Sequence, residues 1–311
     1  MTGSLVHTFA VMGTVVSFRV VGRGLPIDDD ARDRVQRAEA WFRDVETACS
    51  RFEPESELRL LCARPAEPVP VSELLYHLLE FALRIAEASG GAFDPTVGRR
   101  MESLGFDRNW RTGRRGSSGE DSGAGVSWRD LRLDPARGTV ELTRPLLLDL
   151  GAVAKGFAVD MAVQELLPLG SFMIDAGGDL FLRGMSEKGL PWSVGVRHPR
   201  SEHELIETLL VTDAAVCTSG DYDRRASPDV HHILDPRTGE SSDRAASVTV
   251  VAPSAMAADA LATAGFVLGP SRGVELLESE GVEGLFFTPE LERLATHGWN
   301  RYRAPAEAAR A

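Results

Sequence analysis

Residues 145–160 read P-L-L-L-D-L-G-A-V-A-K-G-F-A-V-D, and the rest of the chain is arranged around the pattern that they set. Leu146 to Leu148 form an apolar run that is typical of a buried strand. Asp149, two glycines and Lys155 follow, and apolar residues then recur at roughly helical spacing. The segment therefore predicts a strand that brings a carboxylate and an ammonium group to a strand-to-helix junction, where small residues admit a ligand and the helix start favours anions. A plain strand–turn–helix with a solvated lysine is equally compatible with this segment alone.

Length, composition and charge limit the classes of protein. The 311 residues suffice for one large domain or two small ones, and a hydrophobic content of 43% predicts a globular protein with a real core. Three scattered cysteines predict reduced thiols rather than disulfides or a zinc cluster. The net charge of −12 argues against nucleic acid or an anionic membrane as partner. It does not exclude a phosphate-bearing substrate, because distant charges are largely screened at physiological salt.

Targeting and membrane signals are missing from the sequence. No segment is long and apolar enough to span a bilayer. The first ten residues lack a basic region followed by an apolar one, and no cysteine near the start could carry a lipid. These features predict a cytoplasmic location and no membrane anchor in this chain.

The order of helices and strands predicts the fold class. Amphipathic helices are expected over residues 28–49 and 71–89, and the second ends at Gly90-Gly91. A low-complexity stretch over residues 112–127 predicts a flexible surface loop, and the tail over residues 304–311 is expected to be disordered. The second half is mostly strands in hairpin-like runs. The sequence therefore predicts an α+β fold with largely antiparallel sheets and packed helices, rather than a doubly wound parallel sheet.

A helix expected over residues 254–266 carries a carboxylate and a hydroxyl on one face. Asp259 and Thr263 are four residues apart, so they share that face. Surrounded by small alanines, they can offer oxygen ligands to a hard cation such as Mg²⁺, which usually keeps substrate phosphates in its shell. A solvated aspartate and a packed threonine would give the same pattern, so the pair alone does not establish a metal site.

Two adjacent histidines, His231 and His232, precede the sequence I-L-D-P-R-T-G. Neighbouring residues on a strand face opposite ways, which argues against a metal site made from both. One of them is a candidate general base or phosphate contact, and the other is expected on the outer face. An ordinary hydrogen-bonded histidine remains the alternative for either.

Two turns have the composition of ligand-binding segments. C-T-S-G-D-Y-D, from Cys217 to Asp223, places hydroxyl groups and a glycine where phosphate oxygens can bind. Ser219 lies outside any G-x-S-x-G elbow, which argues against a serine hydrolase. D-A-G-G-D, from Asp175 to Asp179, does not match G-x-G-x-x-G, so a Rossmann fold has no support.

Taken together, these segments resemble the ApbE family, the magnesium-dependent FAD:protein FMN transferases. Each motif is short, but eight occur in the family's order between residues 8 and 290. They are M-G-T at Met12, S-R-F-x-P-x-S-E-L at Ser50, G-G-A-F-D-P-T-V-G at Gly90, L-D-L-G-A-V-A-K-G-F-A-V-D at Leu148, D-A-G-G-D at Asp175, T-S-G-D-Y at Thr218, H-I-L-D-P-R-T-G at His232 and V-T-V-V-A-x(5)-A-D-A-L-A-T-A at Val248. The resemblance implies one T-fold-related domain with two lobes over residues 5–303.

The resemblance also implies a reaction. FAD is cleaved at its pyrophosphate, FMN passes to a threonine or serine hydroxyl of an acceptor flavoprotein, and AMP leaves. We therefore expect FAD as substrate, Mg²⁺ as cofactor with Mn²⁺ as a substitute, and an acceptor flavoprotein as partner. Two alternatives remain: a metal-dependent FAD pyrophosphatase that gives FMN and AMP, and a non-catalytic flavin-binding module. The joint presence of Asp259, Thr263 and His232 argues against the second alternative.

Roles of single residues follow from the resemblance as well. It implies side-chain ligands of magnesium at Asp259 and Thr263 and backbone-carbonyl ligands at Ala152 and Ala262. His232 matches the family histidine proposed to activate the acceptor hydroxyl, and the resemblance implies that both His232 and Asp259 are catalytic. The positions implied to contact FAD are Met12, Phe52, Ala92, Phe93, Asp94, Asp149, Lys155, Ser219, Asp221 and Ile233.

Two departures from the family pattern bear on the expected function. Phe52 stands where many members have tyrosine, so stacking on the isoalloxazine ring survives but a phenolic hydrogen bond does not. This region is expected to influence the choice between transfer and hydrolysis. Many bacterial members are exported lipoproteins, and this chain shows no such signal, so the expected acceptor is cytoplasmic or the cytoplasmic part of a membrane protein.

Overall fold

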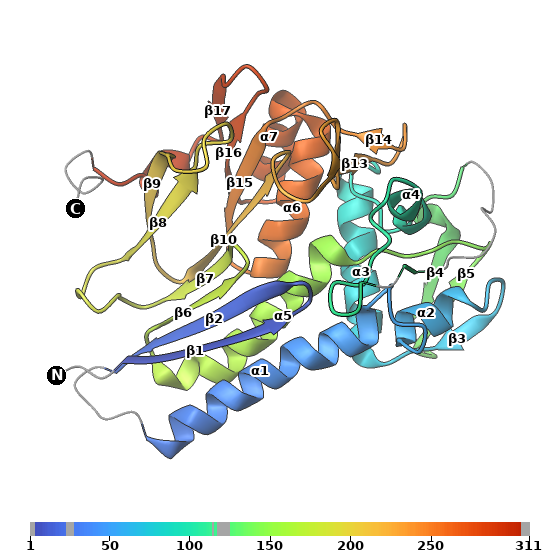
Figure 1. Ribbon diagram of the computed structural model, residues 1–311, viewed down its shortest axis with the longest axis horizontal. Coiled ribbons are helices and arrows are strands. Elements are labelled where there is room, and N and C mark those ends of the chain that lie inside the picture. The colour runs from blue at the N-terminus through green and yellow to red at the C-terminus, as the bar shows by residue number, and fades with distance from the viewer. Residues whose placement is uncertain (1–3, 23–27, 114, 117–124, 306–311) are drawn as a thin grey trace.

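The computed structural model describes residues 4–22, 28–113, 115–116 and 125–305, and every structural statement below refers to these residues. Its central element is an eight-stranded sheet in which all neighbouring strands are antiparallel (Figure 1). The predicted α+β class with antiparallel pairing is therefore confirmed. In spatial order the strands are β1 (Ser4–Val11), β2 (Thr14–Val21), β6 (Phe172–Ala176), β7 (Asp179–Arg183), β10 (Ala214–Gly220), β15 (Ser247–Ala252), β16 (Glu283–Phe287) and β17 (Arg293–Ala295).

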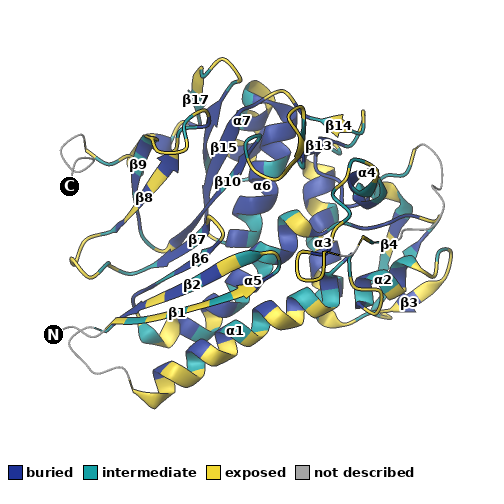
Figure 2. Cartoon of the chain, viewed as in Figure 1, coloured by how far each residue is buried: buried dark blue, intermediate teal, exposed yellow. Residues whose placement is uncertain are grey.

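Helices cover one face of this sheet, and their apolar sides form the larger core. The long first helix starts where the side chain of Asp28 accepts a hydrogen bond from the Ala31 amide. Its buried residues lie on one side, as expected for an amphipathic helix: Ala31, Val35, Ala38, Phe42, Val45 and Cys49. The two central helices, α5 (Gly151–Leu166) and α6 (Ala255–Leu268), have apolar residues on most sides (Figure 2). The main sheet covers them on one side and other helices cover them on the other. The helices of this layer are α1 (Asp29–Cys49), α3 (Glu73–Ala88), α5 (Gly151–Leu166), α6 (Ala255–Leu268) and α7 (Pro270–Ser279).

A smaller layer covers the opposite face. A two-stranded sheet and a one-turn helix pack there around the fully buried Trp299, in a second core separate from the first. These elements are β8 (Trp192–Arg197), β9 (Leu205–Val211) and η3 (Trp299–Arg301). The chain thus has three layers, with helices and a small sheet on opposite sides of the main sheet.

A second lobe lies beyond the end of the first helix, on the right of Figure 1. Its three-stranded sheet shares the larger core with the main sheet, since Val69, Leu131 and Val140 belong to the same buried cluster as Phe18. The lobe comprises α2 (Glu57–Cys62), β3 (Pro68–Pro70), α4 (Gly98–Ser103), η1 (Trp128–Asp130), β4 (Leu131–Asp134) and β5 (Thr139–Leu142). The remaining short elements are η2 (Leu167–Leu169), β11 (Arg225–Ser227), β12 (Val230–His231), β13 (Leu234–Asp235) and β14 (Glu240–Ser241).

One expected strand is not formed. Leu146 to Leu148 are at most 1% exposed, as predicted, but they pair with no strand in the described part of the chain. Their backbone polar groups bond to loop atoms instead: Gly98 donates to the Leu147 carbonyl, and the Asp149 amide donates to the Pro95 carbonyl. The prediction of burial was right and that of a strand was wrong, because an apolar run reveals burial but not the partner of its backbone.

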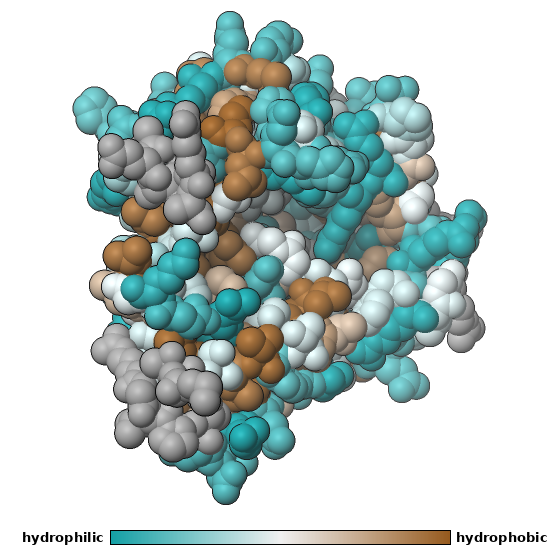
Figure 3. Space-filling view, turned by 60° about the vertical axis from the view of Figure 1, so that its left-hand side comes forward, coloured by the Kyte–Doolittle hydropathy of each residue, from teal (hydrophilic) through white to brown (hydrophobic). Residues whose placement is uncertain are grey.

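The surface shows hydrophobic residues in separate groups among hydrophilic ones on the face turned forward in Figure 3. None of the described helices is both long and apolar enough to cross a bilayer. The expected loop over residues 112–127 and the expected tail over 304–311 fall largely outside the described residues. Those two expectations and the cytoplasmic location stay predictions.

Candidate active site

The side chain of Lys155 joins two carboxylates where α5, α6 and β7 meet. Its ammonium group contacts the carboxylate of Asp179 and lies 4.0 Å from Oδ2 of Asp259. All three side chains are at most 15% exposed. The structure therefore brings Lys155 and Asp259 together, although they are 104 positions apart in the sequence. Asp179 adds a second negative charge to the site. From the sequence, the motif D-A-G-G-D that contains it predicted only a turn.

The close approach of α5 to α6 sets this arrangement. A Cβ atom on Gly156 would lie 2.5 Å from Cα of Met256, so only glycine fits at the contact. One turn further along α5, the carboxylate of Asp160 accepts hydrogen bonds from the amides of Ala255 (2.7 Å) and Met256 (3.0 Å). These amides belong to the first turn of α6 and would otherwise lack partners. Gly156 and Asp160 thereby fix where α6 presents Asp259.

Asp259 is buried with one oxygen unused. Its Oδ2 atom has no hydrogen-bond partner among the described residues. Burial raises the pKa of Asp259, while the charges of Lys155 and Arg224 act to lower it. With Asp179 beside it, the site holds two carboxylates around one ammonium group. A buried carboxylate oxygen without a partner is costly, so the site favours a further cation.

The residues near Asp259 along α6 carry oxygen atoms of the kind that a hard metal ion binds. The hydroxyl of Thr263 lies one turn along α6, with Oγ1 3.3 Å from Oγ of Ser219. Ala262 is buried beside Thr263, and Ala152 lies partly exposed in the first turn of α5. Within the described ranges, no three His, Cys, Asp or Glu side chains cluster as metal ligands. A donor set of one carboxylate, one hydroxyl and carbonyl groups fits Mg²⁺, which commonly retains water and substrate phosphates.

The two histidines differ in their surroundings. His232 is partly exposed, but its Nδ1 atom is buried and has no partner in the described part of the chain. The Asp223 carbonyl accepts a hydrogen bond from its ring. Burial lowers the pKa of His232 to about 4, with the charges of Arg224 and His231 acting in the same direction, so the ring is neutral at pH 7.

His231 has a structural role. Its Nε2 lies 3.0 Å from the Ser242 carbonyl, and its Nδ1 accepts a hydrogen bond from the Ile233 amide at 3.3 Å. The ring packs edge-on against Phe266. His231 therefore lies in the interior, not on the outer face as expected, because both ring nitrogens find partners there.

Asp149 is neutralised by an arginine that the sequence did not single out. Arg51 donates from Nε to Oδ2 of Asp149 at 2.5 Å, and the Gly151 amide donates to Oδ1 at 2.8 Å. The guanidinium group lies 4.1 Å from the ring centroid of Phe52 and also donates to the Phe106 carbonyl. Arg51 thus links the carboxylate of the junction to the aromatic ring that is expected to stack on a flavin.

The other residues that are expected to contact the flavin differ in how far they are buried. Met12 occupies the β1–β2 turn with a positive φ of 52°, and its amide donates to Glu46 at 2.8 Å. Asp94 is buried, accepts hydrogen bonds from Thr96 and the Trp128 amide, and has its pKa raised by burial. The side chains at most 5% exposed, which leave a ligand little surface, are Ala92, Phe93 and Ile233.

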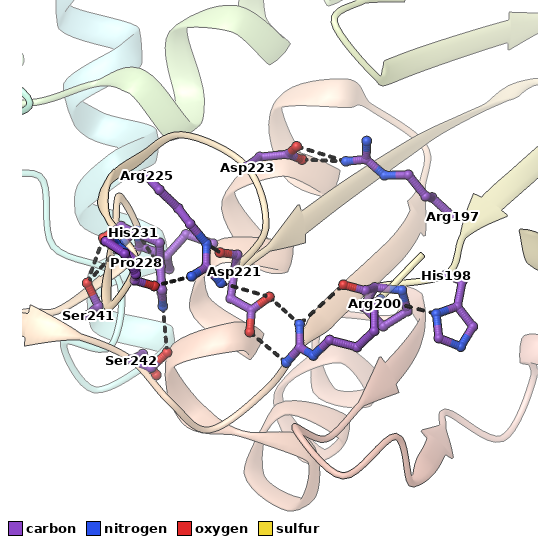
Figure 4. A network of polar contacts seen from close by, with 12 residues as sticks. Arg197, His198, Arg200, Asp221, Asp223, Arg225, Pro228, His231, Ser241 and Ser242 are labelled. Carbon is purple, nitrogen blue, oxygen red and sulfur yellow. Dashed lines mark hydrogen bonds and ion pairs between the residues drawn. The ribbon is translucent and has the colours of Figure 1, made fainter. Parts of the chain in front are cut away.

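Asp221 already has a partner. Arg200 forms two hydrogen bonds to its carboxylate, at 2.6 and 2.8 Å, as Figure 4 shows. Arg197 pairs with Asp223 through one nitrogen, because Nη2 lies 2.8 and 2.9 Å from the two carboxylate oxygens. These ion pairs hold the loop after β10 against β8 and the segment that follows it. Asp221 is thus placed to support the loop, while Ser219 lies beside Thr263 at the site.

Comparison with known sequences gives matches along most of the chain. The model of the ApbE family matches residues 12–286. The FAD:protein FMN transferase of Treponema pallidum is 34% identical over 319 residues, which cover 93% of this chain and 85% of the relative. The protein of the same name from Vibrio cholerae is 30% identical over 280 residues, covering 87% and 83%.

Solved structures show the same fold. The ApbE protein of Thermotoga maritima superposes with a TM-score of 0.83 at 28% identity, covering 97% of this chain and all of the other. The flavin transferase ApbE of Vibrio cholerae gives a TM-score of 0.84 at 25% identity, with the same coverage. Both similarities therefore extend over both lobes.

Proposed function

The chain belongs to the ApbE family, and from that premise we propose that it is a magnesium-dependent FAD:protein FMN transferase. It would transfer FMN from FAD to a threonine or serine hydroxyl of an acceptor flavoprotein and release AMP. The observation that carries the proposal is the buried Oδ2 atom of Asp259, which has no hydrogen-bond partner among the described residues and lies 4.0 Å from Nζ of Lys155. A site with this unused carboxylate oxygen beside an ammonium group suits a cation and a diphosphate together.

The metal ion would be held by Asp259 and Thr263, with the carbonyl groups of Ala152 and Ala262 and with Mn²⁺ as a substitute. When bound, it would neutralise charge on the diphosphate of FAD, as metal ions do in other phosphoryl transfers. Lys155 would bind the same diphosphate. We assign the remaining contacts with FAD to Met12, Phe52, Ala92, Phe93, Asp94, Asp149, Ser219 and Ile233, and a supporting role to Asp221.

His232 would act as the general base. Its pKa of about 4 leaves the imidazole neutral and able to accept a proton at pH 7, and the negative charge of a bound diphosphate would raise that pKa and strengthen the base. The acceptor hydroxyl gives its proton to His232, and its oxygen bonds to the phosphorus of FMN. The bond from that phosphorus to the bridging oxygen breaks, and AMP leaves with the electron pair.

The test is covalent flavinylation of an acceptor. The protein is mixed with FAD, Mg²⁺ and candidate flavoproteins, and intact-mass spectrometry measures the gain of one FMN. We expect Asp259→Asn to lower the transfer rate at least ~100-fold, because one preorganised charge contact is lost. The matched control is Glu275→Gln, which removes an exposed carboxylate from α7.

A second readout does not depend on activity. With ADP present, Mg²⁺ should raise the melting temperature of the unaltered protein and not that of Asp259→Asn, because a ligand stabilises only a fold that binds it. Full transfer by Asp259→Asn would contradict the metal role. Release of AMP at the same rate with and without acceptor would instead favour the pyrophosphatase.

A further inference from the structure

One exposed arginine near the site forms no hydrogen bond or ion pair with a described residue. The segment between β10 and His232 carries two adjacent arginines, Arg224 and Arg225. Arg225 donates from Nε to the Asp221 carbonyl at 2.8 Å and contacts the Pro228 carbonyl. Arg224 makes no hydrogen bond or ion pair with any described residue, and it is exposed. An unpaired guanidinium group in a chain of net charge −12 is available for an anion.

The backbone of Arg224 is held in an unfavourable conformation. Its φ of 45° lies in the left-handed region, where a residue with a Cβ atom is strained. Both neighbours are anchored: Asp223 by two hydrogen bonds from Arg197, and Arg225 by the carbonyls that it binds (Figure 4). Strain that the surroundings enforce in this way is concentrated at ligand-binding and catalytic positions.

The strained position lies within electrostatic reach of the predicted catalytic residues. The carbonyl of Asp223, the residue before Arg224, accepts a hydrogen bond from the ring of His232. The positive charge of Arg224 acts to lower the pKa of His232 and that of Asp259, so it lies within electrostatic reach of both. Lys155 is already in contact with Asp179 and close to Asp259. Arg224 is therefore a cation within electrostatic reach of His232 and Asp259 that forms no ion pair with any described carboxylate.

We propose that Arg224 binds the diphosphate of FAD and stabilises the charge that develops on the departing AMP. This inference rests on the proposed function and adds a residue to it. A guanidinium group offers paired donors that match phosphate oxygens, and charge-assisted hydrogen bonds of this kind are strong. When the bond from the FMN phosphorus to the bridging oxygen breaks, the electron pair stays on the AMP phosphate. A fixed positive charge there lowers the energy of that transition state.

The test uses Arg224→Gly, with affinities for FAD and ADP measured by titration calorimetry. Glycine adopts a positive φ without strain, so this variant should keep or raise the melting temperature. We expect its affinity for both ligands to fall about 10- to 100-fold through the loss of charge-assisted hydrogen bonds. Arg224→Lys keeps the charge without the paired donors, so its affinities should lie between those of the unaltered protein and those of Arg224→Gly. Arg272→Ala removes an exposed guanidinium group from α7 and should bind as the unaltered protein does.

Three results would overturn the inference: unchanged affinities in Arg224→Gly, an equal loss in Arg272→Ala, or a loss that accompanies a lower melting temperature. The proposed function can fail separately. A protein that binds ADP through Arg224 but never transfers FMN keeps this inference and loses that function. If Arg224→Gly transfers FMN as well as the unaltered protein does, the proposed function is kept and this inference is lost.

Discussion

His231 and His232 are neighbours in sequence, yet only one has a ring nitrogen free for chemistry. Both nitrogens of His231 lie within hydrogen-bond distance of backbone groups. The Nδ1 atom of His232 has no partner in the described structure. The alternation of side chains along a strand indicates that the two differ, but not which is which, because each environment is built by distant segments.

The pH dependence of stability should report on His232. Its pKa falls from 6.5 to about 4 on folding, so between these pH values the unfolded chain takes up a proton that the folded protein does not. Acidification from pH 6.5 to 4 therefore favours the unfolded state through this group. We expect His232→Asn to make the decline of the melting temperature over this window shallower.

The comparison with the unaltered protein isolates this effect. Asp160 has a pKa raised to about 6 by burial, so acidification below pH 6 relieves the cost of its buried charge and acts in the opposite direction. That contribution is present in both proteins and cancels in their difference. His77→Asn, at an exposed position of α3, serves as control. Parallel melting curves for His232→Asn and the unaltered protein would contradict the assigned pKa.

Among the elements, the contact between α5 and α6 positions the site. Lys155 lies on one helix and Asp259 on the other, so their separation depends on how closely the helices approach. Gly156 permits the contact, and Asp160 caps the first turn of α6. The G-x-x-x-D spacing along α5 puts both residues on the same face.

Replacing Gly156 by alanine should disturb both stability and activity. The added Cβ would meet the Met256 backbone at 2.5 Å, so the helices must separate. We expect a loss of about 1–3 kcal/mol in the free energy of unfolding from overpacking, and a lower rate of FMN transfer. Urea denaturation and the mass-gain assay measure the two effects. Gln164→Ala, on the exposed side of α5, should change neither, and an unaffected Gly156→Ala would show that the contact is not tight.

The whole molecule places its two cores on opposite faces of the main sheet. The larger core lies with α5 and α6 on the side of the site, and the smaller one surrounds Trp299 beneath β8 and β9. Trp299 is fully buried, and its indole nitrogen donates to Glu207 at 2.7 Å. Because the sheet separates the cores, a substitution in the smaller core should lower the stability of the protein without changing its affinity for a ligand.

Truncation of Trp299 tests this separation. Trp299→Ala should lower the free energy of unfolding by about 3–5 kcal/mol through the cavity that it leaves. Trp299→Phe keeps an aromatic ring and loses the hydrogen bond, so its loss should be smaller. The affinity of the folded protein for FAD should stay unchanged in both. A matching fall in FAD affinity would mean that the two cores are coupled, and Leu190→Ala, 58% exposed, should leave both quantities unaltered.

Local pattern was enough for the helices, for the antiparallel class and for part of the site. The helices expected over residues 28–49 and 71–89 are found over Asp29–Cys49 and Glu73–Ala88, because apolar spacing and capping residues determine them. The antiparallel class follows from the hairpin-like order of strands. Asp259 and Thr263 share a helix face because they are four residues apart. Such features depend on residues that are close in the sequence, within one helical turn or one hairpin. The sequence therefore contains the information that determines them.

Contacts between distant segments required the folded structure. Arg51 reaches Asp149 across 98 residues, and Lys155 meets Asp179 and Asp259 on two other elements. The absence of an ion pair between Arg224 and any described residue also became visible only in the folded structure, once the partners of its neighbours were known. Whether a charge is neutralised, buried or free depends on distance and dielectric in space, and a one-dimensional pattern of residue types does not contain those quantities.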